Sequence, residues 1–190
     1  MYNKVLVALP FLFAASSLNA TVIDIDFNDY DHSTGISDAQ GVTFSLDGYP
    51  GDTGLATTSG ITWSSTSYLS NTSTGVYPTT ERLIFDFDEL VTDVSFVFQN
   101  WGTGKSFYTA YGLDDVELEI GSLAGANGDI FTLASSGISQ LVFDNGYEGY
   151  RNWQFGVASL SATTVDIPEP ALIALLGFGL LGFGASRKKS

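Results

Sequence analysis

The sequence contains no cysteine and only one histidine, His32, among its 190 residues. A chain without cysteine forms no disulfide, no thiolate metal site and no cysteine nucleophile. The chain also lacks a Gly-x-Ser-x-Gly nucleophile elbow, and one histidine leaves little room for a charge relay or a zinc site. Nucleophilic and zinc-dependent enzymes are therefore disfavoured, we expect no catalytic residue of either kind, and the fold has to depend on its hydrophobic core.

Basic residues are also scarce, with 7 Lys and Arg against 21 Asp and Glu. Four of the seven lie within the first four or the last four positions, whereas every acidic residue lies between Asp24 and Glu169. The stretch between these ends therefore has three basic and 21 acidic residues, a net charge of −18. Such a charge repels nucleic acid and anionic lipid, so we expect no nucleic-acid partner. It suits neutral glycans, cationic partners or divalent metal, and it also serves solubility alone.

The N-terminal residues 1–20 read MYNKVLVALPFLFAASSLNA. Lys4 is followed by an apolar run over 5–15 and by small residues up to Ala20. This order is typical of a secretory signal peptide that is cleaved after Ala20. It predicts signal peptidase and the secretion machinery as partners, and a mature chain that begins outside the cytoplasm.

The C-terminal residues 167–190 combine three features in a fixed order. Pro168, Glu169 and Pro170 precede an uncharged stretch over 171–185, and Arg187, Lys188 and Lys189 follow it. As a helix, the uncharged stretch reaches about 22 Å, which is short of a hydrocarbon core of about 30 Å. The three basic residues keep the end of such a helix on the cytoplasmic side. The sequence therefore predicts a marginal membrane helix with the rest of the chain outside.

This tail resembles the PEP-CTERM sorting signals of Gram-negative bacteria, with 168–170 as the tripeptide. The resemblance implies that an exosortase, a membrane-embedded cysteine transpeptidase, recognises the tail and cleaves near the tripeptide. It also implies delivery to the cell surface or to the exopolysaccharide matrix. The alternative from the residues alone is an ordinary C-terminal anchor helix, which equally leaves the body outside.

The body between the two ends, residues 21–166, is long enough for one domain with a real core. Apolar and polar residues alternate in segments such as TVIDIDF, RLIFDFD, VTDVSFVFQ and ISQLVFD, and turn residues separate them. About nine or ten short strands at this spacing predict an all-β fold, and we expect a two-sheet jelly-roll-like β-sandwich. The body also resembles the sandwiches common in PEP-CTERM proteins, which open with an acidic DF strand (24–27 here) and close with a W-x-F-G-V strand (153–157 here).

Three carboxylates are the candidates for an enzymatic alternative. The segment DDVELEI predicts a strand with Asp115, Glu117 and Glu119 on one face, because side chains on a strand alternate. Paired carboxylates about 5–9 Å apart are what glycoside hydrolysis needs. The same alternation is typical of any solvent-facing strand, so we expect a non-enzymatic protein and keep a glycan-active hydrolase as the alternative.

A second candidate site is a calcium loop in the segment DYDHSTG. Asp29, Asp31 and Ser33 place oxygen ligands at every second position, which is the kind of ligand that calcium prefers. The glycine comes one position too late for an EF-hand, and Gln40 stands where the closing glutamate would be. We therefore expect at most a structural calcium ion in a loop of another geometry.

The tryptophans Trp63, Trp101 and Trp153 stand near glycine and serine rather than inside long apolar runs. Exposed aromatic faces close to amides and carboxylates bind sugar rings, although burial is the usual fate of any one aromatic side chain. The resulting hypothesis is an exported surface or matrix protein that binds polysaccharide through these tryptophans. A purely structural matrix protein, with all three tryptophans buried, is the remaining alternative.

Overall fold

The computed structural model describes the chain in segments, all of which belong to one compact unit, Ala20–Val165. The described residues are 20–31, 34–47, 57–60, 67–70, 82–100, 106–144 and 155–165. The predicted signal peptide and the sorting tail, with the terminal helices expected there, lie outside these residues. No helix within the described segments is long and apolar enough to cross a membrane.

The described segments are built almost entirely from strands, and all of the paired strands are antiparallel. The strands are β1 (Val22–Asp26), β2 (Asp38–Ala39), β3 (Val42–Asp47), β4 (Thr57–Gly60), β5 (Ser67–Ser70), β6 (Arg82–Asn100), β7 (Phe107–Tyr111), β8 (Glu117–Ser122), β9 (Asn127–Thr132), β10 (Ile138–Asp144) and β11 (Phe155–Thr164). Two short 3-10 helices, η1 (Phe27–Asp29) and η2 (Leu113–Asp115), follow β1 and β7.

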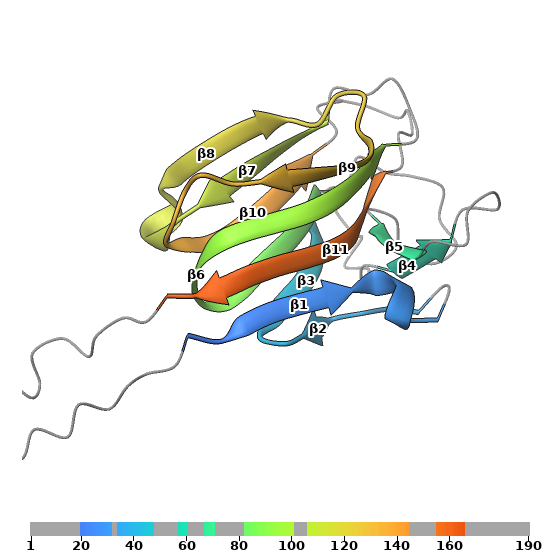
Figure 1. Ribbon diagram of the computed structural model, residues 1–190, viewed down its shortest axis with the longest axis horizontal. Coiled ribbons are helices and arrows are strands. Elements are labelled where there is room, and N and C mark those ends of the chain that lie inside the picture. The colour runs from blue at the N-terminus through green and yellow to red at the C-terminus, as the bar shows by residue number, and fades with distance from the viewer. Residues whose placement is uncertain are drawn as a thin grey trace, which may run out of the picture. The chain divides into compact units, whose positions relative to one another are not determined.

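The strands form two layers that share β6, a strand of 19 residues. Its first half, 82–87, pairs with β3 and β10, and β7 and β8 continue this layer. Its second half, 91–100, pairs with β11 and β9, and β1 joins on the far side of β11. In Figure 1, β1, β11, the second half of β6 and β9 lie in front, with β3 and β10 behind them.

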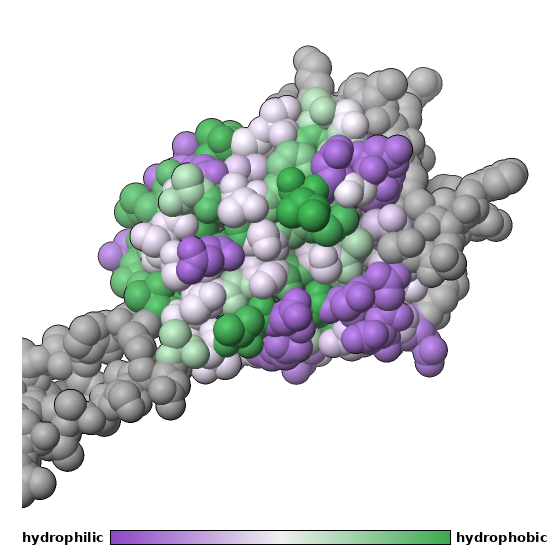
Figure 2. Space-filling model, in the orientation of Figure 1, coloured by the Kyte–Doolittle hydropathy of each residue, from purple (hydrophilic) through white to green (hydrophobic). Residues whose placement is uncertain are grey.

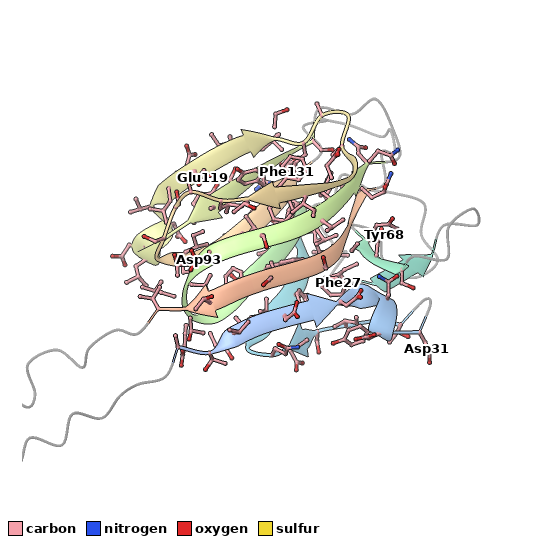
Figure 3. All side chains as sticks on the ribbon, viewed as in Figure 1. Phe27, Asp31, Tyr68, Asp93, Glu119 and Phe131 are labelled. Atoms are coloured by element: carbon pink, nitrogen blue, oxygen red, sulfur yellow. The ribbon has the colours of Figure 1, made fainter. Side chains whose placement is uncertain are left out.

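Two of the segments expected as separate strands, RLIFDFD and VTDVSFVFQ, are the two halves of β6. Between them the alternation changes phase: Phe85 and Val91 are buried at odd positions, whereas Val94 and Phe96 are buried at even ones. Asp93 causes the change, because it has a φ of 53° and adds one residue to β6 opposite β11. This bulge lies near the bend where β6 passes from one layer to the other (Figure 3).

Phenylalanine rings from the two layers meet between them and form the core. Phe143 on β10 packs edge-on against Phe96 of the second half of β6, with the ring centroids 4.9 Å apart. Phe27, which follows β1, packs against Phe44 of β3 at 5.5 Å. All four side chains are at most 2% exposed. The predicted all-β, two-sheet β-sandwich is therefore confirmed.

Candidate functional site

The layer of β3, β6, β10, β7 and β8 has one face in the core and one outer face, which we call the five-strand face. Alternate residues such as Phe44, Phe85, Leu141 and Ala110 are opposite one another in the register and point inward. The residues between them consequently point outward, because successive side chains of a strand lie on opposite sides. The register of the four strand pairs thus fixes which side chains are neighbours on this face.

Three rows of side chains cross the five-strand face from β3 to β8. The arginine row is Asp47, Arg82, Asp144, Phe107 and Ser122. The middle row is Ser45, Ile84, Val142, Thr109 and Ile120. The tyrosine row is Thr43, Asp86, Gln140, Tyr111 and Glu117. Neighbouring strands are about 4.8 Å apart, so side chains next to one another in a row are within contact distance.

Polar side chains of the arginine row are connected by ion pairs. Arg82 donates from Nε to Asp144 Oδ2 at 2.9 Å, and its Nη1 lies 3.9 Å from Asp47 Oδ2. The guanidinium is about half exposed, so these pairs contribute little to stability. They bring three polar side chains from three strands together next to Phe107.

The tyrosine row contains a second connected pair. Gln140 Nε2 donates to Asp86 Oδ1 at 2.7 Å, which fixes the orientation of both side chains. Tyr111 and then Glu117 continue the row. Among the described residues no basic side chain lies in this row, and none forms an ion pair with either of its two carboxylates.

Two aromatic side chains, Phe107 and Tyr111, lie on the same strand and on the same face, four residues apart. This spacing separates their Cα atoms by about 13 Å, which is longer than one sugar ring. Both are partly exposed, and no described ring packs against either, in contrast to the buried rings of Phe85 and Phe143. The shorter side chains of the middle row lie between them. Apolar rings beside fixed donors and acceptors suit an extended ligand with apolar ring faces and many hydroxyl groups.

Glu119, which is labelled in Figure 3, is one of the three candidate carboxylates of the enzymatic alternative, and its hydrogen bonds give it a structural role. It accepts hydrogen bonds from Tyr108 Oη at 2.7 Å and from the backbone N–H groups of Ala134 and Ser135 at 2.9 Å each. Burial by itself raises the pKa of Glu119, but these hydrogen bonds outweigh it and lower the pKa below its ordinary value. Burial and the bond to Glu119 raise the pKa of Tyr108. The carboxylate therefore connects β8 and β7 to the segment between β9 and β10.

The expectation that Asp115, Glu117 and Glu119 share one face of a strand is wrong. Asp115 lies in η2 with a φ of 57°, before β8 begins at Glu117. In addition, β8 has one more residue than β7 between the pairs Glu117–Tyr111 and Glu119–Ala110, so a bulge at Leu118 breaks the alternation. Glu117 points outward in the tyrosine row, whereas Glu119 points inward, and the three do not form a catalytic set.

The predicted calcium loop is only partly described. Asp29 lies in η1, Asp31 is exposed just after it (Figure 3), and Ser33 lies outside the described residues. Asp26 caps η1 by accepting from the backbone N–H of Asn28 at 2.9 Å. Within the described segments no group of three or more potential ligand side chains could hold a metal ion. The calcium site stays a prediction.

The three tryptophans proposed for glycan binding, Trp63, Trp101 and Trp153, all lie outside the described residues. The hypothesis that these tryptophans bind glycan stays a prediction.

The sequence alone did not identify the residues of the five-strand face as a site, because residues that are neighbours on this face are far apart in the chain. Arg82 and Asp144, for example, are 62 positions apart. The one available signal was the outward half of each alternating segment, which carries Arg82 and Asp86 in RLIFDFD.

Comparison with known proteins confirms the sorting signal. Residues 166–188 match the family model of the PEP-CTERM protein-sorting motif, a range that includes the predicted tripeptide and two of the three predicted basic residues, Arg187 and Lys188. The motif implies export, processing by an exosortase and a membrane-anchored state before processing. No curated protein matches the chain. Among solved structures, a mutant of the family 29 carbohydrate-binding module CBM29-2 matches with 14% identity over 80% of this chain and 93% of that one, at a TM-score of 0.42.

Proposed function

We propose that the body of this exported protein binds polysaccharide through the five-strand face and catalyses no reaction. The observation that carries the proposal is the pair of partly exposed rings, Phe107 and Tyr111, on one strand between two fixed polar pairs. Rings of this kind pack against the apolar faces of sugars, and the polar pairs supply hydrogen bonds to hydroxyl groups.

The size and order of the face support a polymeric ligand. Five strands at about 4.8 Å give a width of about 19 Å, and the two rings are about 13 Å apart along β7. A single sugar cannot contact both rings at once. A chain of several sugars can contact both, and it loses less entropy per contact when donors and acceptors are held in place beforehand.

The arrangement of the acidic residues supports binding rather than hydrolysis. Glu119 is held by three hydrogen bonds and Asp115 lies outside the strand, so neither is placed to work with Glu117 on a bound glycan. Hydrolysis needs two carboxylates on either side of one glycosidic bond. A glycan-active enzyme would require a second carboxylate next to Glu117 on the same face.

The sorting signal supports the place of action that we propose. A protein delivered to the cell surface or to the surrounding matrix meets the exopolysaccharide of its own cells at high local concentration. Its acidic body does not bind nucleic acid or anionic lipid, because like charges repel. We therefore propose the exopolysaccharide, rather than the membrane surface, as the partner of the five-strand face.

The test is binding of the purified full-length protein, in a mild detergent, to exopolysaccharide from the producing cells. Replacing both Phe107 and Tyr111 by alanine is expected to weaken binding more than about tenfold, because aromatic anchors supply most of the energy at such sites. The matched control is Ile130→Ala, since Ile130 is 73% exposed on the opposite face of the sandwich. It is expected to leave binding unchanged.

Two outcomes would contradict the proposal. If the wild-type protein does not bind, the body is better described as a structural matrix protein. If Ile130→Ala weakens binding as much as the double replacement of Phe107 and Tyr111 does, the proposed binding face is wrong.

Repeating the assay with a chelator tests the predicted structural calcium, because loss of a bound ion would lower both stability and binding.

A further inference from the structure

We infer that the polysaccharide bound by the five-strand face carries free amino groups and is therefore cationic. The inference rests on the proposed function and specifies its ligand. It follows from the charges on the face and from the two carboxylates of the tyrosine row, Asp86 and Glu117.

The charge balance of the face favours a cation. Among the described residues, its three rows hold four carboxylates and one guanidinium, and the guanidinium of Arg82 is already shared by two of the carboxylates. The compact unit Ala20–Val165 has three basic and 19 acidic residues, a net charge of −16. The net charge of the unit attracts a cationic polymer over long distances, and the carboxylates of the face attract it once it is bound. A polymer of uronic acids or sulfated sugars is repelled.

The tyrosine row places two carboxylates on either side of an aromatic ring. Asp86 accepts one hydrogen bond, from Gln140, to Oδ1, and no described residue donates to its Oδ2. Glu117 is exposed and forms no hydrogen bond or ion pair with the described residues. Both carboxylates thus retain acceptor positions that point outward.

An ammonium group on a sugar matches this row in three ways. It brings three N–H donors, which suit the open carboxylate oxygens. It brings a positive charge, and hydrogen bonds between charged partners are about twice as strong as neutral ones. It also interacts favourably with the face of Tyr111, which lies in the same row. Acetylation removes the charge and two of the donors while it leaves the sugar ring and backbone unchanged.

The experiment compares two hexasaccharides with the same β-1,4 backbone, one of glucosamine and one of N-acetylglucosamine. Binding to the full-length protein in detergent is measured by titration calorimetry at low salt and at about 0.15 M salt. We expect the glucosamine hexamer to bind about tenfold more tightly at low salt, a difference of about 1.4 kcal/mol. We expect the preference to fall at the higher salt, because screening shortens the Debye length to about 8 Å.

Variants test whether the preference for the glucosamine hexamer depends on the carboxylates of the five-strand face. Glu117→Gln is expected to reduce it several-fold, and the double change Asp86→Asn with Glu117→Gln is expected to bring the two hexamers within about twofold of each other. Asp24→Asn is the matched control, because it removes one negative charge from an exposed position on the opposite face. It is expected to leave the preference unchanged. Glu117 is exposed at the start of β8, so its variant is expected to fold.

The results separate this inference from the proposed function. Equal affinity for the two hexamers, or a preference that Asp24→Asn removes as well, overturns the inference and leaves polysaccharide binding in place. Binding to exopolysaccharide but to neither hexamer also overturns the inference. Loss of binding in the Phe107 and Tyr111 double variant, with the preference abolished only by changes at Asp86 and Glu117, supports both.

Discussion

The two outer faces of the sandwich share one core but differ in the side chains that they present. The second face, which we call the four-strand face, covers β9, the second half of β6, β11 and β1 (Figures 1 and 2). Three of its rows are Ile130, Val97, Ser159 and Asp26, then Thr132, Ser95, Ser161 and Asp24, then Thr92, Thr163 and Val22. Figure 2 views the molecule from this side, where residues of intermediate hydropathy fill most of the middle.

The difference favours a role for the five-strand face beyond solubility. The four-strand face combines short serine and threonine side chains with edge aspartates and with the exposed apolar side chains of Val22 and Ile130, a mixture that is ordinary for a surface in water. The five-strand face has, in addition, an arginine between two carboxylates, an amide on a carboxylate and two rings. Ordering long side chains costs conformational entropy, and exposed ion pairs return little of it. A ligand that uses these groups would account for the cost.

The largest expected loss of stability comes from replacing a core residue that lies between the two layers. Phe143 is fully buried and its ring lies 4.9 Å from Phe96 and 5.2 Å from Phe85. Phe143→Ala should reduce the free energy of unfolding by about 3–5 kcal/mol, because it leaves a cavity between the layers. Urea unfolding measures the loss, and Phe107→Ala on the outer face should lose far less. Equal losses would mean that Phe107 is part of the core, and the contrast between the two would fail.

The next largest effect is expected in one layer and not in the other. At Gly121 on β8, a Cβ atom would overlap the ring of Tyr108, which is buried and held by Glu119. Gly121→Ala should therefore cost about 1–3 kcal/mol and displace β7, which carries Phe107 and Tyr111. Hydrogen exchange should increase in β7 and β8 but not in β1 and β11. Ile120→Ala is the control, and uniform protection in both layers after Gly121→Ala would contradict the assignment.

The sequence predicted the sandwich but not the arrangement of its faces, and β6 shows why. Alternation identified the buried residues of both halves, since Leu83 and Phe96 are apolar at the correct spacing. It did not indicate that Asp93 would form a bulge and join the halves, because an aspartate at positive φ looks like any polar strand residue. The rows depend on register between strands that are distant in sequence, so Arg82 and Asp144 could not be paired in advance.

A smaller effect concerns Glu119, which attaches the edge of the five-strand layer to the segment after β9. Glu119→Gln keeps the shape of the side chain but replaces a charged acceptor, and it should cost roughly 1 kcal/mol. Exchange of the Ala134 and Ser135 amides should become faster, because these amides donate to the carboxylate. Glu117→Gln, two positions away and exposed, is the matched control. Unchanged exchange at both amides would show that the carboxylate does not hold this segment.

The same carboxylate predicts how stability depends on pH. The pKa of Glu119 in the folded protein is lower than its ordinary value of 4.5, so folding favours the ionised form. Its contribution is fully present above pH 4.5 and is lost as the pH falls further, through the folded-state pKa. Thermal unfolding from pH 7 to pH 3 should therefore show a smaller stability loss in Glu119→Gln than in the wild type. Parallel pH profiles would contradict the prediction.

The smallest expected effect tests the four-strand face directly. Ser159 and Ser161 lie in the middle of this face on β11, partly exposed and opposite Val97 and Ser95. Replacing both by alanine should change the free energy of unfolding by less than about 0.5 kcal/mol, because these are surface substitutions. Polysaccharide binding should be unchanged, because the proposed site lies on the other face. Urea unfolding and the exopolysaccharide assay measure the two quantities. If binding is lost, the ligand contacts the hydroxyl groups of the four-strand face, and the ordered side chains of the five-strand face would need another explanation. If binding is retained while the Phe107 and Tyr111 variant loses it, the two faces differ in function as they differ in structure.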